Sequence, residues 1–196
     1  MTKVYQAEIS SEEVQKLPSV VVDGEVLCID TMEKFNEVRD ELFLESLWGV
    51  DTETRPCFTK GQSNIRRVAL LQMSSREKTY IFRLNCIGFP QELVDIMSSS
   101  RFTKVGLSLT DDIRGLQKTK KFTPAGFIDL QSIAPNYGIK EKSLQKLAAI
   151  VLGCHISKSQ RLTNWEAPEL TQKQILYAAT DSWITRKIYV ELNNGQ

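Results

Sequence analysis

Residues 47–54, Leu47-Trp48-Gly49-Val50-Asp51-Thr52-Glu53-Thr54, form an apolar run that ends in two acids. A short apolar run of this kind, following a helical pattern, predicts a buried strand. Side chains alternate across a strand, so Asp51 and Glu53 are expected on the same face. Two close carboxylates repel each other, and a divalent cation such as Mg²⁺ or Mn²⁺ relieves the repulsion because hard cations prefer oxygen ligands. Acids at a strand end also occur simply where the chain enters solvent, so the pair alone does not define a site.

Length and composition indicate one compact domain with a sizeable core. The chain has 196 residues, of which 41% are hydrophobic and 25% charged. We find no signal-peptide pattern and no apolar run of membrane-spanning length, so we expect a cytoplasmic protein without membrane association. The four cysteines are scattered and there is a single histidine. This spacing indicates neither a zinc site nor a disulfide framework.

The charge distribution is a weak indicator of function. The formal net charge is only +1, which argues against a general nucleic-acid binder that relies on excess positive charge. Basic residues nevertheless gather in four places. These clusters are either solvated faces or a rim that follows phosphates. They are Lys60/Arg66/Arg67, Lys118/Lys120/Lys121, Lys140/Lys142/Lys146 and Lys158/Arg161.

The pattern of elements predicts an α/β fold with a mixed five-stranded sheet flanked by helices. A meander of three strands comes first, and two parallel strands alternating with helices follow. The division into domains is a peripheral helix and hairpin extension over residues 1–29, with Asp23-Gly24 as the hairpin turn, and the main domain over residues 30–196. The strands are expected at 47–54, 68–73, 79–84, 104–106 and 127–130, and the helices at 10–17, 31–44, 90–98, from 109, 143–152 and 171–192.

Two further aspartates fall where a helix should be apolar. Asp112 borders the stripe of Leu109, Ile113 and Leu116, although an acid in a first helical turn also suits the helix dipole. Asp181 lies on a stripe with apolar neighbours, one turn after Tyr177. Burying an unpaired carboxylate costs several kcal/mol. A charged group therefore meets Asp181, unless Tyr177 is an ordinary core residue and the aspartate is bonded to backbone.

These motifs together resemble those of the DEDD superfamily of 3′–5′ exonucleases, tyrosine subclass, of the Werner-syndrome and ribonuclease D type. The likeness covers about residues 30–192 and includes Asp51-Thr52-Glu53, Asp112 and the phrase Tyr177-Ala178-Ala179-Thr180-Asp181. Supporting phrases are Val68-Ala69-Leu70-Leu71-Gln72, Lys104-Val105-Gly106 and Leu162-Thr163-Asn164-Trp165-Glu166. The sister subclass has a histidine five residues before the last aspartate, where this chain has Leu176. Asp111 departs from the pattern and leaves open which of two adjacent aspartates is used.

The resemblance implies a ribonuclease H-like fold and a two-metal mechanism using Mg²⁺ or Mn²⁺ that releases nucleoside 5′-monophosphates. It implies that Asp51 bridges both ions, that Glu53 and Asp181 complete the first site, and that Asp112 holds the second ion through water. By the same resemblance, Tyr177 positions the attacking water.

Substrate contacts and partners are expected as follows. Phe58, Lys60 and Arg66 in the loop after the central strand, and Lys158 near the end of the chain, are candidates for binding nucleic acid. Phe58 as plain loop packing is equally consistent, and Trp165 is expected in the core. Any helicase or repair partner is expected to be a separate chain. The alternatives are a catalytically silent exonuclease fold that acts as an interaction module and a phosphoesterase for small nucleotides.

Overall fold

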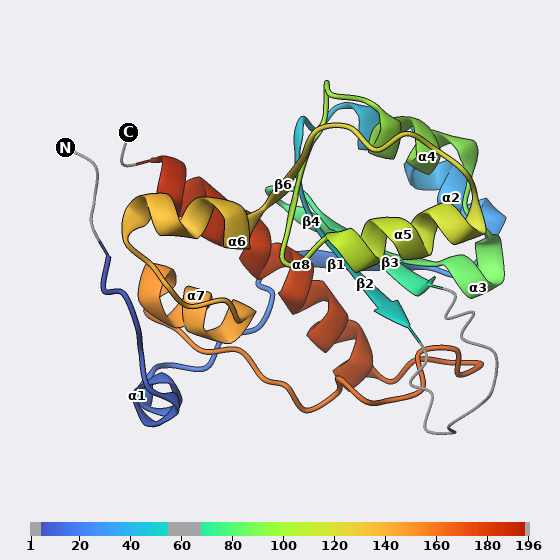
Figure 1. Ribbon diagram of the computed structural model, residues 1–196. Coiled ribbons are helices and arrows are strands. Elements are labelled where there is room, and N and C mark those ends of the chain that lie inside the picture. The colour runs from blue at the N-terminus through green and yellow to red at the C-terminus, as the bar shows by residue number, and fades with distance from the viewer. Residues whose placement is uncertain (1–4, 55–67, 195–196) are drawn as a thin grey trace, which may run out of the picture.

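A six-stranded mixed sheet lies at the centre of the molecule (Figure 1). The computed structural model describes residues 5–54 and 68–194. Strands β2, β3 and β4 form the predicted antiparallel meander, and β5 and β6 continue the sheet in parallel beyond β2. The order across the sheet is β1-β4-β3-β2-β5-β6. The strands are β1 Glu25–Ile29, β2 Leu47–Thr54, β3 Val68–Ser74, β4 Lys78–Arg83, β5 Thr103–Gly106 and β6 Phe127–Asp129.

Helices cover both faces of this sheet. The long helix α8 contacts five of the strands and lies diagonally across one face, beside α7 (Figure 1). Its start is fixed by Thr171, whose side chain accepts from the Gln174 amide while the Gln174 side chain accepts from the Thr171 amide. The α-helices are α1 Ser11–Lys16, α2 Met32–Val38, α3 Leu84–Ile87, α4 Gln91–Ser98, α5 Thr110–Thr119, α6 Leu130–Ile133, α7 Leu144–Leu152 and α8 Gln172–Asn193, with 3-10 turns at Glu41–Phe43 and Ala134–Tyr137.

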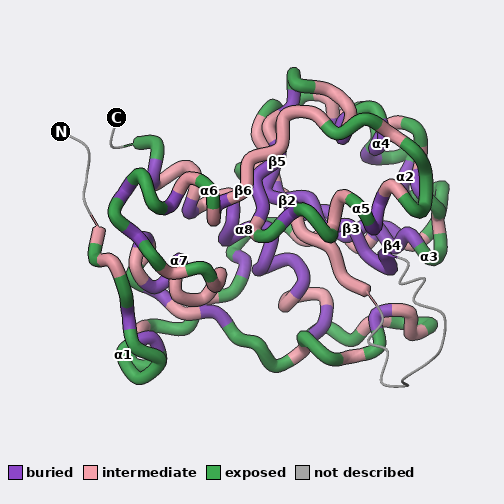
Figure 2. Tube along the Cα trace, in the orientation of Figure 1, coloured by how far each residue is buried: buried purple, intermediate pink, exposed green. Residues whose placement is uncertain are grey.

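The sheet separates two apolar cores. One lies under α6, α7 and α8 and contains Leu147, Trp165 and Ile184. The other lies under α2, α4 and α5 and contains Phe35 and Leu93. Figure 2 shows that the strands and the middle of α8 are the most deeply buried parts of the trace. Residues of β2 alternate between these cores, which places its acids on a defined face.

The predicted mixed sheet flanked by helices is confirmed, but the hairpin over residues 20–29 is wrong. Strand β1 pairs in parallel with β4 and so adds a sixth strand at the edge of the sheet. The preceding residues are held elsewhere: the Val20 amide donates to the His155 carbonyl (3.0 Å) and the Val22 amide donates to Thr180 Oγ1 (3.1 Å). The chain then passes close to the backbone of Glu77, and only a glycine fits at position 24, because a Cβ there would lie 2.4 Å from the Glu77 carbonyl oxygen. The division of the chain at residue 29 stays a prediction.

The helix expected over residues 31–44 is shorter than its apolar pattern. The α-helical part ends at Val38, and a separate 3-10 turn, Glu41–Phe43, continues the chain. Phe35, Val38 and Leu42 are buried, whereas Met32 is 42% exposed. Because the chain leaves the helix after Val38 and still buries Leu42, the spacing of apolar residues did not locate the end of the helix.

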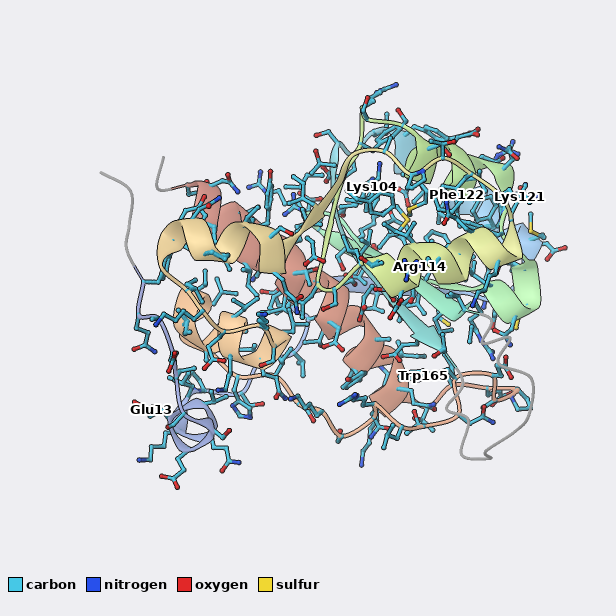
Figure 3. All side chains as sticks on the ribbon, in the orientation of Figure 1. Glu13, Lys104, Arg114, Lys121, Phe122 and Trp165 are labelled. Carbon is cyan, nitrogen blue, oxygen red and sulfur yellow. The ribbon has the colours of Figure 1, made fainter. Side chains whose placement is uncertain are left out.

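Lys104 on β5 is a buried cation without a carboxylate partner among the described residues. Its ammonium donates to the carbonyl oxygens of Ile96 (2.9 Å), Ser99 (2.7 Å) and Phe102 (2.7 Å), which fixes the C-terminal end of α4. Figure 3 shows Lys104 within the layer between β5 and α4. Buried carbonyls at a helix end need donors, and one lysine supplies three of them here.

We expect Lys104→Met to lower the free energy of unfolding by about 3 kcal/mol, because it leaves three carbonyl groups without their charged donor. Lys121→Met, on the surface after α5, is the matched control and should change stability by less than about 0.5 kcal/mol. Urea unfolding followed by circular dichroism measures both. Equal midpoints for the two variants would contradict this role.

The cysteines that the structure describes form no disulfide, and the described helices include no membrane-spanning segment. Cys28, Cys86 and Cys154 are free, and Cys57 lies outside the described residues. None of the helices in the described ranges is both long and apolar enough to cross a bilayer.

Candidate active site

Three carboxylates from two distant parts of the chain meet at the end of β2. Asp51 and Glu53 project from the same face of the strand, and Asp181 comes from the middle of α8. One oxygen of each lies within 4.8 Å of the others. Asp181 is only 8% exposed, and the other two are half-buried. Hard carboxylate oxygens at this spacing are the ligands that Mg²⁺ and Mn²⁺ prefer, so the donor set fits a divalent ion.

Gly49 allows this convergence. A Cβ at Gly49 would lie 2.0 Å from the Ser182 carbonyl oxygen and 2.8 Å from Arg186 Cβ, both on α8. The helix therefore lies directly against the backbone of β2, two residues before Asp51. A second contact supports the same approach, since the hydroxyls of Ser182 and Ser74 are 2.7 Å apart in the buried interface between α8 and β3. Close packing of α8 on β2 brings Asp181 within reach of the strand carboxylates.

Asp112 lies next to this cluster but is not one of its three members. It occupies the first turn of α5 and accepts a short hydrogen bond from the Thr52 hydroxyl. Its neighbour Asp111 points away, with its side chain 94% exposed and 3.5 Å from Arg114. The geometry thus favours Asp112 over Asp111 as the fourth acid.

Tyr177 lies one helical turn before Asp181, as the sequence spacing requires. Its phenol lies close enough to the Asp181 carboxylate for each group to influence the pKa of the other. Its ring is tilted against Trp165, with ring centroids 6.0 Å apart, and Trp165 is fully buried as predicted. Figure 3 shows Trp165 beside the first turns of α8. Burial and the charge of Asp181 raise the pKa of the Tyr177 phenol, so it remains a neutral donor at physiological pH.

The acids of the site resist ionisation because they are buried and close to one another. Burial, and then the charges of its acidic neighbours, raise the pKa of Asp51 well above its usual range. Burial followed by the Asp181 and Asp112 charges raises the pKa of Glu53 to about 8. Burial, and then the charges of Asp111 and Asp129, raise the pKa of Asp112 to about 6 against the lowering effect of its hydrogen bond to Thr52. Burial raises the pKa of Asp181 to about 7. A group of acids that resists ionisation without a cation is a candidate metal site.

Because ionisation of these buried acids is unfavourable, the free energy of unfolding depends on pH and on bound metal. The pKa of Glu53 is raised on folding, so its ionisation destabilises the metal-free fold progressively from about pH 4.5, its ordinary value, to about pH 8. We expect Glu53→Gln to be more stable than the wild type in chelator at pH 8, by roughly 2 kcal/mol, with the difference vanishing below pH 4.5. Saturating Mn²⁺ should stabilise the wild type more than the variant. Thermal melts at several pH values, with chelator or Mn²⁺, measure this. A wild type that remains more stable than Glu53→Gln in chelator at pH 8 would contradict it.

Two basic side chains act on the cluster from the segment before α8. The Lys158 charge lowers the pKa of Asp181, and the Arg161 charge lowers the pKa of Glu53. Lys158, a predicted substrate contact, therefore lies close enough to influence the acids. Phe58, Lys60 and Arg66, the other predicted contacts, lie outside the described residues.

A cavity of about 640 Å³ opens beside Glu53 and Asp112, between the end of β2 and α5. Its volume is in the range of small-ligand sites. Arg114 and Lys118, one helical turn apart on α5, contribute positive charge to its lining. Figure 3 shows Arg114 projecting from α5. The cavity thus has carboxylates at one end and cations along one side.

Sequence reasoning missed three residues that shape this site. Thr52 was treated only as the residue between two acids, Gly49 only as part of an apolar strand, and Arg114 was in none of the basic clusters. The alternation of β2 could have indicated Thr52, because it must face away from Asp51. No local signal distinguishes Gly49, since its role depends on where α8 packs.

Comparison with known proteins shows the family to which the chain belongs. The family model described as 3′–5′ exonuclease matches residues 26–195. The chain is 34% identical over 161 residues to exonuclease 3′–5′ domain-containing protein 2 of Drosophila melanogaster, covering 80% of this chain and 27% of that protein. It is 33% identical over 153 residues to the mouse bifunctional 3′–5′ exonuclease/ATP-dependent helicase WRN, covering 74% of this chain and 11% of that protein.

A solved structure supports the fold alone. The Aedes aegypti Nibbler EXO domain superposes with a TM-score of 0.80 at 19% identity, covering 90% of this chain and 92% of that one. The chain belongs to the 3′–5′ exonuclease family. It spans between about a tenth and a quarter of the length of the two curated relatives described here.

Proposed function

We propose that this chain is a metal-dependent 3′–5′ exonuclease that hydrolyses phosphodiester bonds from the 3′ end of nucleic acid and releases nucleoside 5′-monophosphates. The observation that carries the proposal is the convergence of Asp51, Glu53 and Asp181 within 4.8 Å, in a chain of this family. Carboxylates at this spacing can neutralise a dication and leave it open to a substrate oxygen.

The proposed roles of the four acids and of Tyr177 follow from their positions in the site. Asp51, Glu53 and Asp181 would hold one divalent ion, and Asp112 would help to hold a second. When bound, such ions would supply positive charge for the attacking and leaving oxygens and would make a water a stronger nucleophile. Tyr177, as a neutral phenol one helical turn from Asp181, would orient the attacking water.

The cavity beside α5 is the proposed place for the 3′-terminal nucleotides. Arg114 and Lys118 along its side can contact backbone phosphates, and Lys158 and Arg161 approach the acids from the segment before α8. Phosphate contacts of this kind position a strand without reading its sequence. Phe58, Lys60 and Arg66 stay predictions as further contacts, as do a helicase partner and a cytoplasmic location.

The test uses 5′-labelled single-stranded DNA and RNA and recessed duplexes with Mg²⁺, Mn²⁺ or chelator. We expect a ladder that shortens from the 3′ end, nucleoside 5′-monophosphates as the products, and no cleavage in chelator. Binding of nucleic acid without cleavage in either metal would favour a silent interaction module. Cleavage restricted to dinucleotides or small nucleotides would favour a phosphoesterase.

A further inference from the structure

The Thr52 side chain connects the two sides of the acid cluster. It lies between Asp51 and Glu53 on β2, and alternation turns it toward α5 rather than α8. There its hydroxyl donates to Asp112 Oδ1. A β-branched residue in a strand has a restricted χ1 torsion, so the hydroxyl direction is set by the strand itself.

The start of α5 is fixed independently of this bond. Asp129 accepts hydrogen bonds from the backbone amides of Ser108 and Leu109, each 3.1 Å. Ser108 has φ 57°, a left-handed conformation that is uncommon for a residue other than glycine. Because Asp129 ties down the turn from β5 into α5, the backbone of Asp112 has a defined position. The remaining freedom of Asp112 is the rotation of its own side chain.

The surroundings of Asp112 on the inner side of α5 are apolar. A void of about 10 Å³ lies behind it, and the side chains lining that void, apart from Asp51, Thr52 and Asp112 themselves, are apolar, among them Leu71 and Met97. These neighbours offer no hydrogen-bond donor. Within the described residues, the Thr52 hydroxyl is thus the side-chain donor that holds the Asp112 carboxylate.

We propose that Thr52 is a positioning residue for the second metal site: its hydrogen bond to Oδ1 fixes the rotation of the Asp112 carboxylate, which would leave Oδ2 available to a metal ion. This inference rests on the proposed function. It explains why Asp112 can serve the site although it stands outside the three-acid cluster. Without the hydroxyl, the carboxylate would rotate among several orientations and bind the second ion more weakly.

The test compares Thr52→Val, which keeps the shape and removes the donor, with Thr52→Ser, which keeps the donor. Thr103→Val at the start of β5 is the matched control, since Thr103 pairs with Leu47 at the other end of β2. Mn²⁺ is titrated calorimetrically with and without a nucleoside 5′-monophosphate, and the Mn²⁺ dependence of cleavage is measured in parallel.

We expect Thr52→Val to bind the weaker Mn²⁺ ion roughly tenfold less tightly, the size of a lost hydrogen bond to a charged group, with the tighter ion changed less than about twofold. Thr52→Ser and Thr103→Val should stay within about twofold of the wild type. A Thr52→Val protein that binds both ions normally, or a Thr52→Ser protein as impaired as Thr52→Val, would overturn the inference.

The outcomes separate this inference from the proposed function. A wild-type protein that binds Mn²⁺ but cleaves no nucleic acid would contradict the exonuclease proposal, while the titrations still decide the role of Thr52. A wild-type protein that binds no Mn²⁺ would overturn both.

Discussion

Asp51→Asn is expected to lower the exonuclease rate by at least about a thousandfold while the protein stays folded. Burial and the charges of Asp181, Asp112 and Glu53 all raise the pKa of Asp51, so its carboxylate lies among the other three acids and is the one whose charge both ions would share. The asparagine keeps the size of the side chain and removes that charge. Losing a shared ligand should abolish the stabilisation of the transition state that the ions provide. Single-turnover cleavage of a 5′-labelled oligonucleotide measures the rate.

The folded state of this variant is checked by circular dichroism and thermal melting, since removing one of several repelling carboxylates should not destabilise it in chelator. Asp95→Asn, an exposed change on α4 outside the three-acid cluster and the cavity lining, is the matched control and should cleave at the wild-type rate. If Asp51→Asn cleaved within about tenfold of the wild type, the assignment of the acids would be wrong.

Gly49→Ala is expected to damage both stability and catalysis although Gly49 carries no functional group. The new methyl group would lie 2.0 Å from the Ser182 carbonyl oxygen, which is backbone and cannot rotate away. Helix α8 must shift, and we expect a loss of about 3 kcal/mol in unfolding free energy. Displacing Asp181 by about 1 Å should lower the cleavage rate by about a hundredfold.

Gly49→Val extends the series, because a larger side chain should move α8 further and weaken Mn²⁺ binding more than alanine does. Urea unfolding, calorimetric Mn²⁺ titration and the cleavage assay measure the three effects. Wild-type stability together with wild-type metal affinity in Gly49→Ala would show that the contact between α8 and β2 does not position Asp181.

The sequence was most informative where a short-range rule determined the geometry. Strand alternation placed Asp51 and Glu53 on one face, and helical spacing placed Tyr177 one turn from Asp181. The meander of β2, β3 and β4 was predicted from strand runs separated by polar turns, and the structure confirms it.

Features that depend on long-range packing could not be predicted in this way. The Asp23-Gly24 pair has the composition of a hairpin turn, yet residues 20–22 bond to α8 and to His155, and β1 joins the far edge of the sheet. Local composition cannot say which segment a strand will pair with. The hydrogen bond from Thr52 to Asp112 joins residues 60 positions apart, so no motif within either element indicates it.

The most direct test of the central claim is a crystal structure of the protein soaked in Mn²⁺, with the metal located by its anomalous scattering. We predict a Mn²⁺ ion bonded to oxygens of Asp51, Glu53 and Asp181, the carboxylates that already lie within 4.8 Å of one another. Anomalous peaks found only at other positions on the protein, with these three carboxylates free of metal, would contradict the account.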